Sequence, residues 1–497
     1  MRLSRIVRIF AALAAVPVIT SGRTASAQGE VRHVSLAEVR RAALKNGVAV
    51  AAARATERSL AARALSIRGD FDTSVGAGLT ARSNTMPGVS DSDFVAGFDR
   101  RVAGQVRAAR ALETGGTFSV ALGQQRTETS IATQGGTQEG RTTFDPTTSA
   151  TLVHPLLRGF GIGPTLAPRR AIDERSRSAS ALRAQAQLDA ELEAVIAYAR
   201  LVQARAERRV RRDGIATNRE QLTLVRALVA SGRAAVGDVA AVERSLRMRE
   251  ADETVLDAEV ALRSAELLRA MGGSPRDILE TEVVPADPLP PPEPRASAEL
   301  AARALAKNPL LVAARAELSA AGYDARFAAS QSLVRLDLTA AVSLVGRERS
   351  LPASTGQLLS GHAPGYFVGL DLSIPLGNRT ARGNEAAANA EVDRRSAELR
   401  DRERELCVAL AGAIAAERAA AERVALASSA EAAAESTLRL EEDRMLAGRS
   451  STSDVLLRQQ ELFDTRLVAI RARTDVAIAG AAIAVLSVAS ESELQAP

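Results

Sequence analysis

The chain has 497 residues, of which 46% are hydrophobic, but only 3% are aromatic and none is Trp. So few large side chains favour thin seams between helices over a thick globular core. The formal net charge is +5, and the cations, almost all Arg, are interspersed with Glu and Asp. This spacing indicates solvated helix faces and disfavours a nucleic-acid partner.

The first predicted element is a cleavable export signal at residues 1–27. Three Arg residues precede an apolar stretch, and Ala25-Ser26-Ala27 supplies the small residues of a cleavage site. The apolar stretch is too short to span a bilayer. The chain has one Cys, Cys407, which cannot form an internal disulfide. The sequence therefore predicts an exported protein without internal disulfides.

The sequence that follows contains an internal repeat. Residues 35–55 and 296–316 resemble each other, and each predicts a short amphipathic helix. Strands in which apolar and polar residues alternate come next in both halves. These strands lie at 71–83, 144–157, 335–345 and 366–376. The first half has about 40 extra residues, which predict an additional hairpin at 100–127. The sequence leaves open whether this hairpin joins a sheet or projects beyond it.

A long helical hairpin follows the strands of each half. The outgoing helices run for more than sixty residues, which corresponds to roughly 95 Å at about 1.5 Å per residue. Each is followed by a segment of similar sequence, SGRAAVGDV at 231–239 and AGRSSTSDV at 447–455, and then by a return helix. These segments predict two hairpin tips, at 232–238 and 448–454.

A Pro-rich segment at 285–294 joins the two halves. Its prolines exclude a helix, so it reads as a linker. The predicted organisation is therefore a first structural repeat at 28–284 and a second at 295–497.

Sites for chemistry are scarce. The loop GFGIGP at 159–164 lacks the spacing of a dinucleotide-binding motif, and a structural turn from strand to helix is the favoured interpretation. The three His residues are scattered without metal-ligand spacing. No catalytic set of Ser, His and Asp or of Cys and His is apparent. We therefore expect no enzyme activity, no metal site and no cofactor.

The strand count bears on the kind of assembly. Four to six strands per chain cannot close a membrane barrel, because the smallest single-chain barrels have eight. Open sheet edges are not tolerated in lipid. If these strands lie in a membrane, several chains must share one barrel, and their long helices must surround a common axis.

The duplicated plan resembles the TolC family of bacterial outer membrane efflux proteins. The resemblance is carried by NPLLVAARAEL at 308–318, by the strand exits HPLLRGFG and IPLGN, and by the two tips. It implies a mainly α fold with a membrane β-barrel portion: a homotrimer whose shared twelve-stranded barrel continues into an α-helical periplasmic tunnel. It also implies an outer membrane location with a long periplasmic extension, and a periplasmic adaptor protein and an inner-membrane pump as partners.

The resemblance also assigns roles to single residues. It predicts that the tips contact the adaptor, and that two Asp residues lie near the periplasmic aperture. Capping of the return helices is a second, compatible role for these Asp residues. Turns from strand to helix complete the predicted set. The tip residues are Gly232, Arg233, Gly448 and Arg449, the aperture or cap residues are Asp238 and Asp454, and the turn residues are Pro155, Gly159, Pro375 and Gly377.

Two positions near the second tip depart from the family pattern. Met445 stands where some members have Tyr, and Leu457 stands where a second acidic residue occurs.

The predicted function is a passive trimeric duct in an efflux or type I secretion system, embedded in outer membrane lipid, whose cargo the sequence does not identify. A secreted structural or adhesive coiled-coil protein is the alternative. A general porin would need more strands than the chain has.

Overall fold

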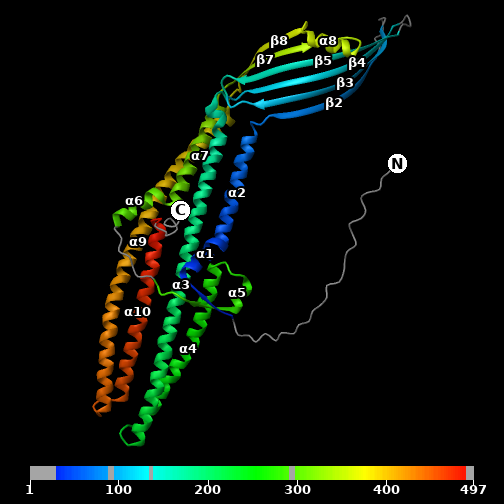
Figure 1. The fold of residues 1–497 in the computed structure, drawn as a ribbon. Helices are drawn as coiled ribbons and strands as arrows, with labels where there is room; N and C mark the ends of the chain where they lie inside the picture. The colour runs from blue at the N-terminus through cyan, green and yellow to red at the C-terminus, as the bar shows by residue number, and fades with distance from the viewer. Residues whose placement is uncertain (1–29, 88–93, 134–137, 290–296, 489–497) are drawn as a thin grey trace, which may run out of the picture.

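A computed structural model describes residues 30–87, 94–133, 138–289 and 297–488. The predicted export signal at 1–27, and the linker from residue 290 onward, lie outside the described residues. The chain is elongated, with a curved sheet at one end and long helices running away from it to two separate tips (Figure 1).

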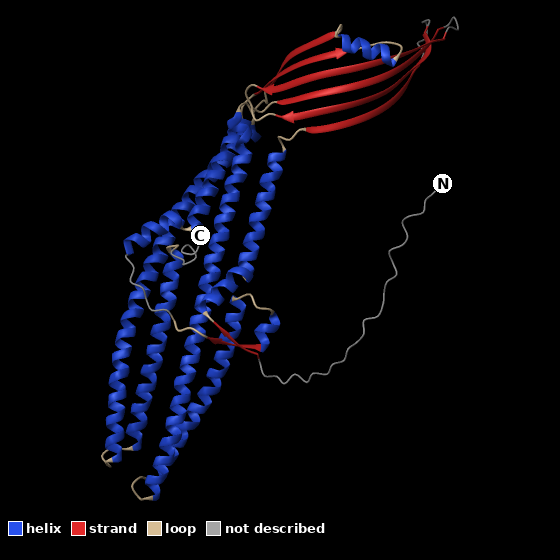
Figure 2. Cartoon of the chain, in the orientation of Figure 1, coloured by secondary structure: helices blue, strands red, loops and turns tan. Residues whose placement is uncertain are grey.

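Four helices form two long hairpins. In the first half α3 (Ile162–Ala230) is followed by α4 (Val236–Ala270), and in the second half α9 (Arg379–Leu446) is followed by α10 (Thr452–Leu486). The outgoing helices have 69 and 68 residues, so each extends for roughly 100 Å. Figure 2 shows the two hairpins side by side and pointing away from the sheet.

The predicted short helices are pairs of helices. The first half has α1 (Leu36–Asn46) and α2 (Val48–Gly69), and the second has α6 (Ser297–Lys307) and α7 (Pro309–Gln331). The expectation of one helix at 35–55 and one at 296–316 was therefore wrong. Both breaks have a local cause. A Cβ at Gly47 would lie 2.5 Å from the carbonyl oxygen of Ala43, and Asn308 caps α7, whose first residue is a proline.

The main sheet has six antiparallel strands in the order β2-β3-β4-β5-β7-β8. Their bounds are β2 Ser74–Pro87, β3 Phe94–Ala111, β4 Thr117–Thr133, β5 Gln138–Pro155, β7 Arg335–Val345 and β8 Pro364–Ser373. The segment 100–127, which the sequence assigned to an extra hairpin, lies in β3 and β4. These strands sit in the middle of the sheet, so the hairpin adds strands to it. One chain therefore has six strands in this sheet, where a twelve-stranded barrel shared by three chains would need four from each.

Four small elements were not expected from the sequence. Strand β1 (Glu30–Val34) pairs in parallel with β6 (Thr281–Pro285) beside the long helices. Helix α5 (Pro275–Glu280) precedes β6, and α8 (Leu351–Ser360) connects β7 to β8.

The core is a seam along the helices. Its largest cluster surrounds Tyr198, Leu201 and Leu267, all fully buried, where α3 and α4 meet the small β1–β6 sheet. The hydroxyl of Tyr198 donates to the carbonyl of Asp287 at 2.8 Å and accepts from its N–H at 2.9 Å. These bonds hold the start of the connection between the halves against α3.

Candidate functional surfaces: the two sheet faces and the hairpin tips

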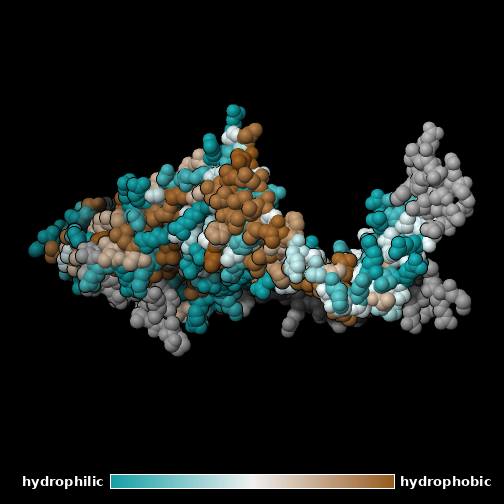
Figure 3. Space-filling model, turned by 90° about the horizontal axis from the view of Figure 1, so that it is seen from above, coloured by the Kyte–Doolittle hydropathy of each residue, from teal (hydrophilic) through white to brown (hydrophobic). Residues whose placement is uncertain are grey.

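One face of the six-stranded sheet is apolar and exposed. Cross-strand pairing aligns Val75, Ala108, Val120, Ala150, Val342 and Tyr366 in one row across all six strands. Val75, Tyr366 and Val368 on this face expose 72 to 77% of their surface, and Leu79 exposes 79%. We call this side the apolar face. Figure 3 shows a broad patch of hydrophobic side chains on the side of the molecule seen from above. Apolar exposure of this extent indicates a surface that another apolar phase covers.

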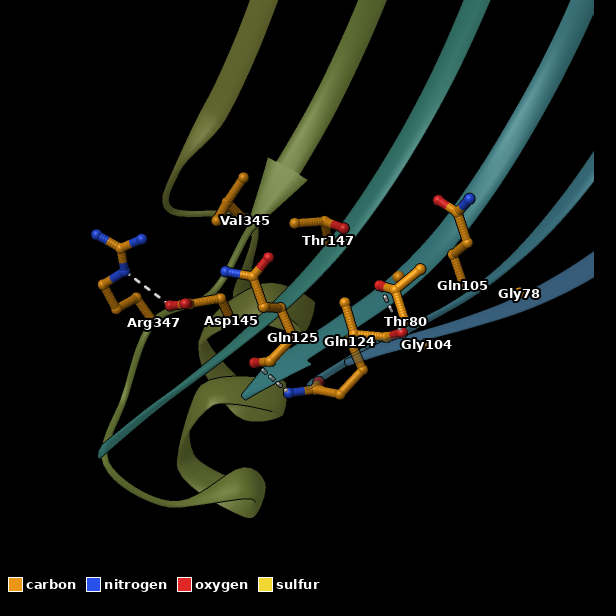
Figure 4. A pocket seen from close by; sticks show the side chains of 12 residues that line it. Gly78, Thr80, Gly104, Gln105, Gln124, Gln125, Asp145, Thr147, Val345 and Arg347 are labelled. Carbon is orange, nitrogen blue, oxygen red and sulfur yellow. Dashed lines mark hydrogen bonds and ion pairs between the residues drawn. The ribbon is translucent and has the colours of Figure 1, made fainter. Parts of the chain in front are cut away.

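The opposite face, which we call the polar face, has the reverse character. Thr80, Ala103, Gln125 and Asp145 are aligned on it across four strands. Figure 4 shows glutamine, threonine and aspartate side chains from neighbouring strands gathered there, with Asp145 joined to Arg347.

Ion pairs neutralise the buried carboxylates of the polar face. Asp145 pairs with Arg347 at 2.7 Å, and Asp337 pairs with Arg335 at 2.7 Å. Asp99 pairs with Arg101 at 2.9 Å. Each of these carboxylates is less than 10% exposed, so its pairing offsets the cost of burying the charge. The period-two alternation therefore separates one face suited to lipid from one suited to water.

On the apolar face, apolar residues do not extend along the full length of the central strands. We call the stretch that they occupy the apolar band. Beyond Val102 on β3 and Leu122 on β4, the same face carries Arg100, Gln124 and Arg126. These positions lie on the side of the sheet away from the long helices, because β3 and β4 are joined by their turn on the helix side. The central strands thus extend past the apolar band into a polar region.

The predicted residues of the strand exits all lie at the junction between sheet and helices. Pro155 is the last residue of β5, and Pro375 lies two residues after β8. Gly159 and Gly377 have φ angles of +81° and +91°, which glycine adopts without steric cost. The N–H of Gly159 donates to the hydroxyl of Ser330 at 3.0 Å, so the exit is tied to the end of α7.

The two tips have the same backbone geometry. Gly232 and Gly448 each have φ +72° and are exposed. The N–H of Arg233 donates to the carbonyl of Leu228 at 2.9 Å, and the N–H of Arg449 donates to that of Arg444 at 2.8 Å. This is the glycine-dependent ending that satisfies the last carbonyls of a helix. The two similar segments, 231–239 and 447–455, therefore form the same turn.

The two Asp residues make unequal caps. The Oδ2 atom of Asp454 accepts from the N–H of Ser451 at 3.1 Å, and the Ser451 hydroxyl accepts from the N–H of Asp454 at 3.2 Å. The Ser451 hydroxyl also donates to Oδ2 of Asp454 at 2.7 Å, and this bond, together with the one from the Ser451 N–H, holds the pKa of Asp454 below its usual 3.8. Asp238 accepts from the N–H of Ala235 at 3.0 Å, but Ala235 has no side-chain oxygen to complete the box. Their placement near an aperture stays a prediction.

The departures near the second tip have a structural counterpart. Met445 is buried and packs with Leu438, Val455 and Leu462 between α9 and α10. Leu457 exposes 54% of its surface. The second tip is thus supported by an apolar cluster.

Sequence reasoning missed the contact between the two hairpins. The guanidinium of Arg211 lies 3.9 Å from the ring centroid of Phe463 on α10, and that of Arg249 lies 5.6 Å from it. Arg249 is only 5% exposed, and a Cβ at Gly214 would lie 2.5 Å from its Nη1 atom. A glycine in the middle of a strongly helical segment was the available signal.

Neither a metal-binding cluster nor a membrane-spanning helix occurs in the part of the chain that the structure describes. No group of three or more His, Cys, Asp or Glu side chains is placed to hold a metal ion within residues 30–87, 94–133, 138–289 and 297–488. Over the same ranges, no helix combines the length and the apolar character needed to cross a bilayer.

Comparison with known proteins agrees with this geometry. Residues 300–487 match the family model for outer membrane efflux proteins. The second half of the chain therefore resembles this family. It is also 27% identical over 297 residues to the outer membrane efflux protein BepC of Brucella suis, an alignment that covers 59% of this chain and 61% of that relative. The resemblance to the TolC family is confirmed.

Solved structures of outer membrane efflux proteins share the fold. The outer-membrane channel OprN superposes with a TM-score of 0.66 at 17% identity, covering 91% of this chain and 89% of that one. The outer membrane protein VceC of Vibrio cholerae gives a TM-score of 0.63 at 16% identity, covering 91% and 96%. The predicted mainly helical fold with a sheet at one end is confirmed. The family is one of outer membrane channels, not of enzymes.

Proposed function

We propose that this chain is one subunit of a trimeric, passive outer membrane duct, which works with a periplasmic adaptor and an inner-membrane pump in efflux or type I secretion. The observation that carries the proposal is the two-faced sheet, whose edge strands β2 and β8 have no further strand beside them among the described residues. Its apolar face suits the hydrocarbon of a bilayer, and its polar face suits a water-filled pore.

The free edges require other copies of the chain. Backbone groups of β2 and β8 without partners would be costly in lipid, and six strands are fewer than the eight of the smallest single-chain barrels. Pairing of β2 in one copy with β8 in the next removes both edges. Three copies then share eighteen strands, and because barrel diameter grows with strand number, this pore is wider than a twelve-stranded one.

The other parts of the chain have the following roles in the proposed duct. Residues 1–27 direct export and are removed, and two repeats, 28–284 and 295–497, joined by the linker 285–294, each contribute strands and one helical hairpin. The hairpins of three subunits surround the axis of the pore and form a tunnel into the periplasm.

The tips are the proposed meeting point with the adaptor. Gly232, Arg233, Gly448 and Arg449 are exposed at the ends of the hairpins farthest from the sheet. Asp238 and Asp454 begin the return helices beside them, where their carboxylates can also face the aperture.

A double substitution at the tips tests the coupling. We expect Gly232→Glu with Gly448→Glu to abolish export in cells, because a side chain at φ +72° strains both turns and adds charge to the docking surface. Gly412→Glu is the matched control, since Gly412 is also exposed on a long helix and has no atom within 4 Å of an added Cβ. Normal export by the double variant would contradict the adaptor role.

A conductance measurement tests the duct itself. Protein extracted from outer membranes with detergent should form water-filled channels in planar bilayers. Release into the periplasm as a soluble, monodisperse protein without channel activity would instead support a structural coiled-coil protein.

A further inference from the structure

Helix α8 lies at the end of the sheet that points away from the long helices. After β7 the chain keeps pairing with β5: the N–H of Gly346 donates to the carbonyl of Pro146 at 3.0 Å. Glu348 and Phe144 then exchange two backbone hydrogen bonds, at 2.8 and 3.2 Å. The alternation of the strand therefore continues through residue 348.

This alternation places α8 on the apolar face. Arg347 reaches Asp145 on the polar face, so Gly346 faces the other side. A Cβ at Gly346 would lie 2.1 Å from the carbonyl oxygen of Ser354 and 3.0 Å from the nitrogen of Leu358. The backbone of α8 thus rests directly on Gly346, an approach that only glycine permits.

The helix is docked firmly. Ser354 of α8 is fully buried, and Pro146 of β5 is buried as well. The N–H of Arg347 donates to the Oε1 atom of Gln357 at 2.7 Å. The helix packs against β5 and β7, which lie inside the edge strand β8 in the sheet.

The outward surface of α8 is uncharged and mostly apolar, with Gln357 and Ser360 as exposed polar residues. Its ten residues, LPASTGQLLS, contain no charged side chain. Leu359 exposes 81% of its surface and Leu351 exposes 47%. Pro352 and Gly356 lie on the same outward side as Leu359, as expected from their helical spacing, and both are exposed. If this surface faced water, its exposed apolar side chains would not stabilise the helix.

The position of α8 continues the apolar face. Gly346 directly follows the β7 residues Val342 and Leu344 of that face, and Tyr366 beside them is 77% exposed. Arg349, at the start of the helix, is exposed and charged. An apolar helix face flanked by Tyr and Arg is the arrangement found at the boundary between acyl chains and headgroups.

We propose that α8 is an interfacial helix that inserts Leu359 into the lipid boundary on the side of the membrane away from the long helices. This inference rests on the proposed function, because it requires the apolar face of the sheet to lie in lipid. The occupant of the surface is therefore lipid, and not a second copy of the chain.

The absence of Trp from the sequence permits a direct test. Leu359→Trp provides a single fluorophore on α8, Leu370→Trp one on the apolar face, and Val236→Trp one at the first hairpin tip. Each variant is reconstituted into vesicles of ordinary phospholipid or of phospholipid brominated on its acyl chains. We expect blue-shifted emission that brominated lipid quenches for Leu359→Trp and Leu370→Trp, and neither effect for Val236→Trp.

The outcomes separate the two proposals. Quenching of Leu370→Trp without quenching of Leu359→Trp overturns the role of α8 and leaves the duct intact. Blue-shifted but unquenched emission from Leu359→Trp would mean that protein covers the helix, which also overturns it. Failure to quench Leu370→Trp overturns the duct, and the inference with it.

A second variant tests the docking of the helix. Gly346→Ala in the Leu359→Trp background forces α8 away from β5, so we expect quenching at residue 359 to decrease. The same substitution with Leu370→Trp should leave quenching unchanged. Equal quenching at residue 359 with and without Gly346→Ala would contradict the placement of α8.

Discussion

The two helical hairpins end in the same turn, and both bury apolar side chains near it, among them Val225 and Val242 in the first, but ion pairs between the helices come closer to the tip of the first hairpin. In the first hairpin, Arg residues of α3 pair with acidic residues of α4 along the seam almost to the tip. These pairs are Arg208–Asp257, Arg211–Asp252, Arg212–Glu253, Arg219–Glu250 and Arg226–Glu243, at 2.6 to 3.2 Å. The second hairpin has Arg423–Asp475 and Arg466–Glu431, and below them the buried cluster of Leu438, Met445, Val455 and Leu462.

The difference predicts how the two tips respond to perturbation. Exposed ion pairs contribute about 0 to 1 kcal/mol each and are weakened by salt. Burial of a Leu side chain contributes about 1.5 to 3 kcal/mol and is not weakened by the screening of charge. The two repeats can therefore share the same turn while different interactions stabilise the helices beside it.

The largest expected effect is at the apolar cluster. Leu462→Ala should destabilise the second hairpin by about 3 kcal/mol, because it removes buried methyl groups and leaves a cavity between α9 and α10. Hydrogen exchange of the amides in residues 438–462 should report it. Leu457→Ala, at an exposed position, is the control. Equal exchange in both variants would mean that the cluster does not hold the tip.

A pair of glycines tests the contact between the hairpins. Gly412→Ala should stabilise the protein by about 1 kcal/mol, since its Cβ meets nothing and alanine favours the helix. Gly214→Ala should lose this gain, because its Cβ displaces the guanidinium of Arg249 from beneath Phe463. Thermal unfolding in detergent measures both. A full gain from Gly214→Ala would show that the Arg249 contact contributes nothing.

Removal of one ion pair should have a smaller and salt-dependent effect. Arg226→Ala breaks the pair with Glu243 nearest the first tip and should cost about 0.5 kcal/mol at low salt. Hydrogen exchange in residues 226–243 should increase, and the difference from the unmodified protein should disappear in concentrated salt. A difference that persists in salt would indicate packing by the Arg side chain instead.

The smallest effect concerns the cap of α10. The pKa of Asp454 is lowered in the folded protein, so the stability contributed by its carboxylate is present above about 3.8 and is lost as pH falls through the lower, folded-state pKa. Asp454→Asn should speed amide exchange in residues 451–455 at neutral pH. It should also remove the local loss of protection that acid causes in the unmodified protein. Unchanged exchange at neutral pH would argue against the cap.

The parts of the fold that were predictable depend on local pattern. Alternation in 335–345 specified which residues of β7 share a face, and the repeated words at 231–239 and 447–455 located both tips, because these signals lie within a few residues of one another. The place of β3 and β4 in the middle of the sheet depends on pairing with β2 and β5, which no local pattern specifies.

The features that were missed depend on distant neighbours. Segment 351–360 contains Pro and Gly and no charge, so it resembles a loop, and its helix depends on the space above Gly346. The stacking of Arg211 and Arg249 on Phe463 depends on how two separate hairpins pack. Gly214 signalled a close approach without naming the residue that makes it.

The central claim is that copies of this chain close the open edges of β2 and β8, and native mass spectrometry of the detergent-extracted protein tests it most directly. The account predicts a single species of three subunits that persists when detergent alone surrounds the apolar face. A stable monomer would contradict it, because its edge strands would then remain unpaired.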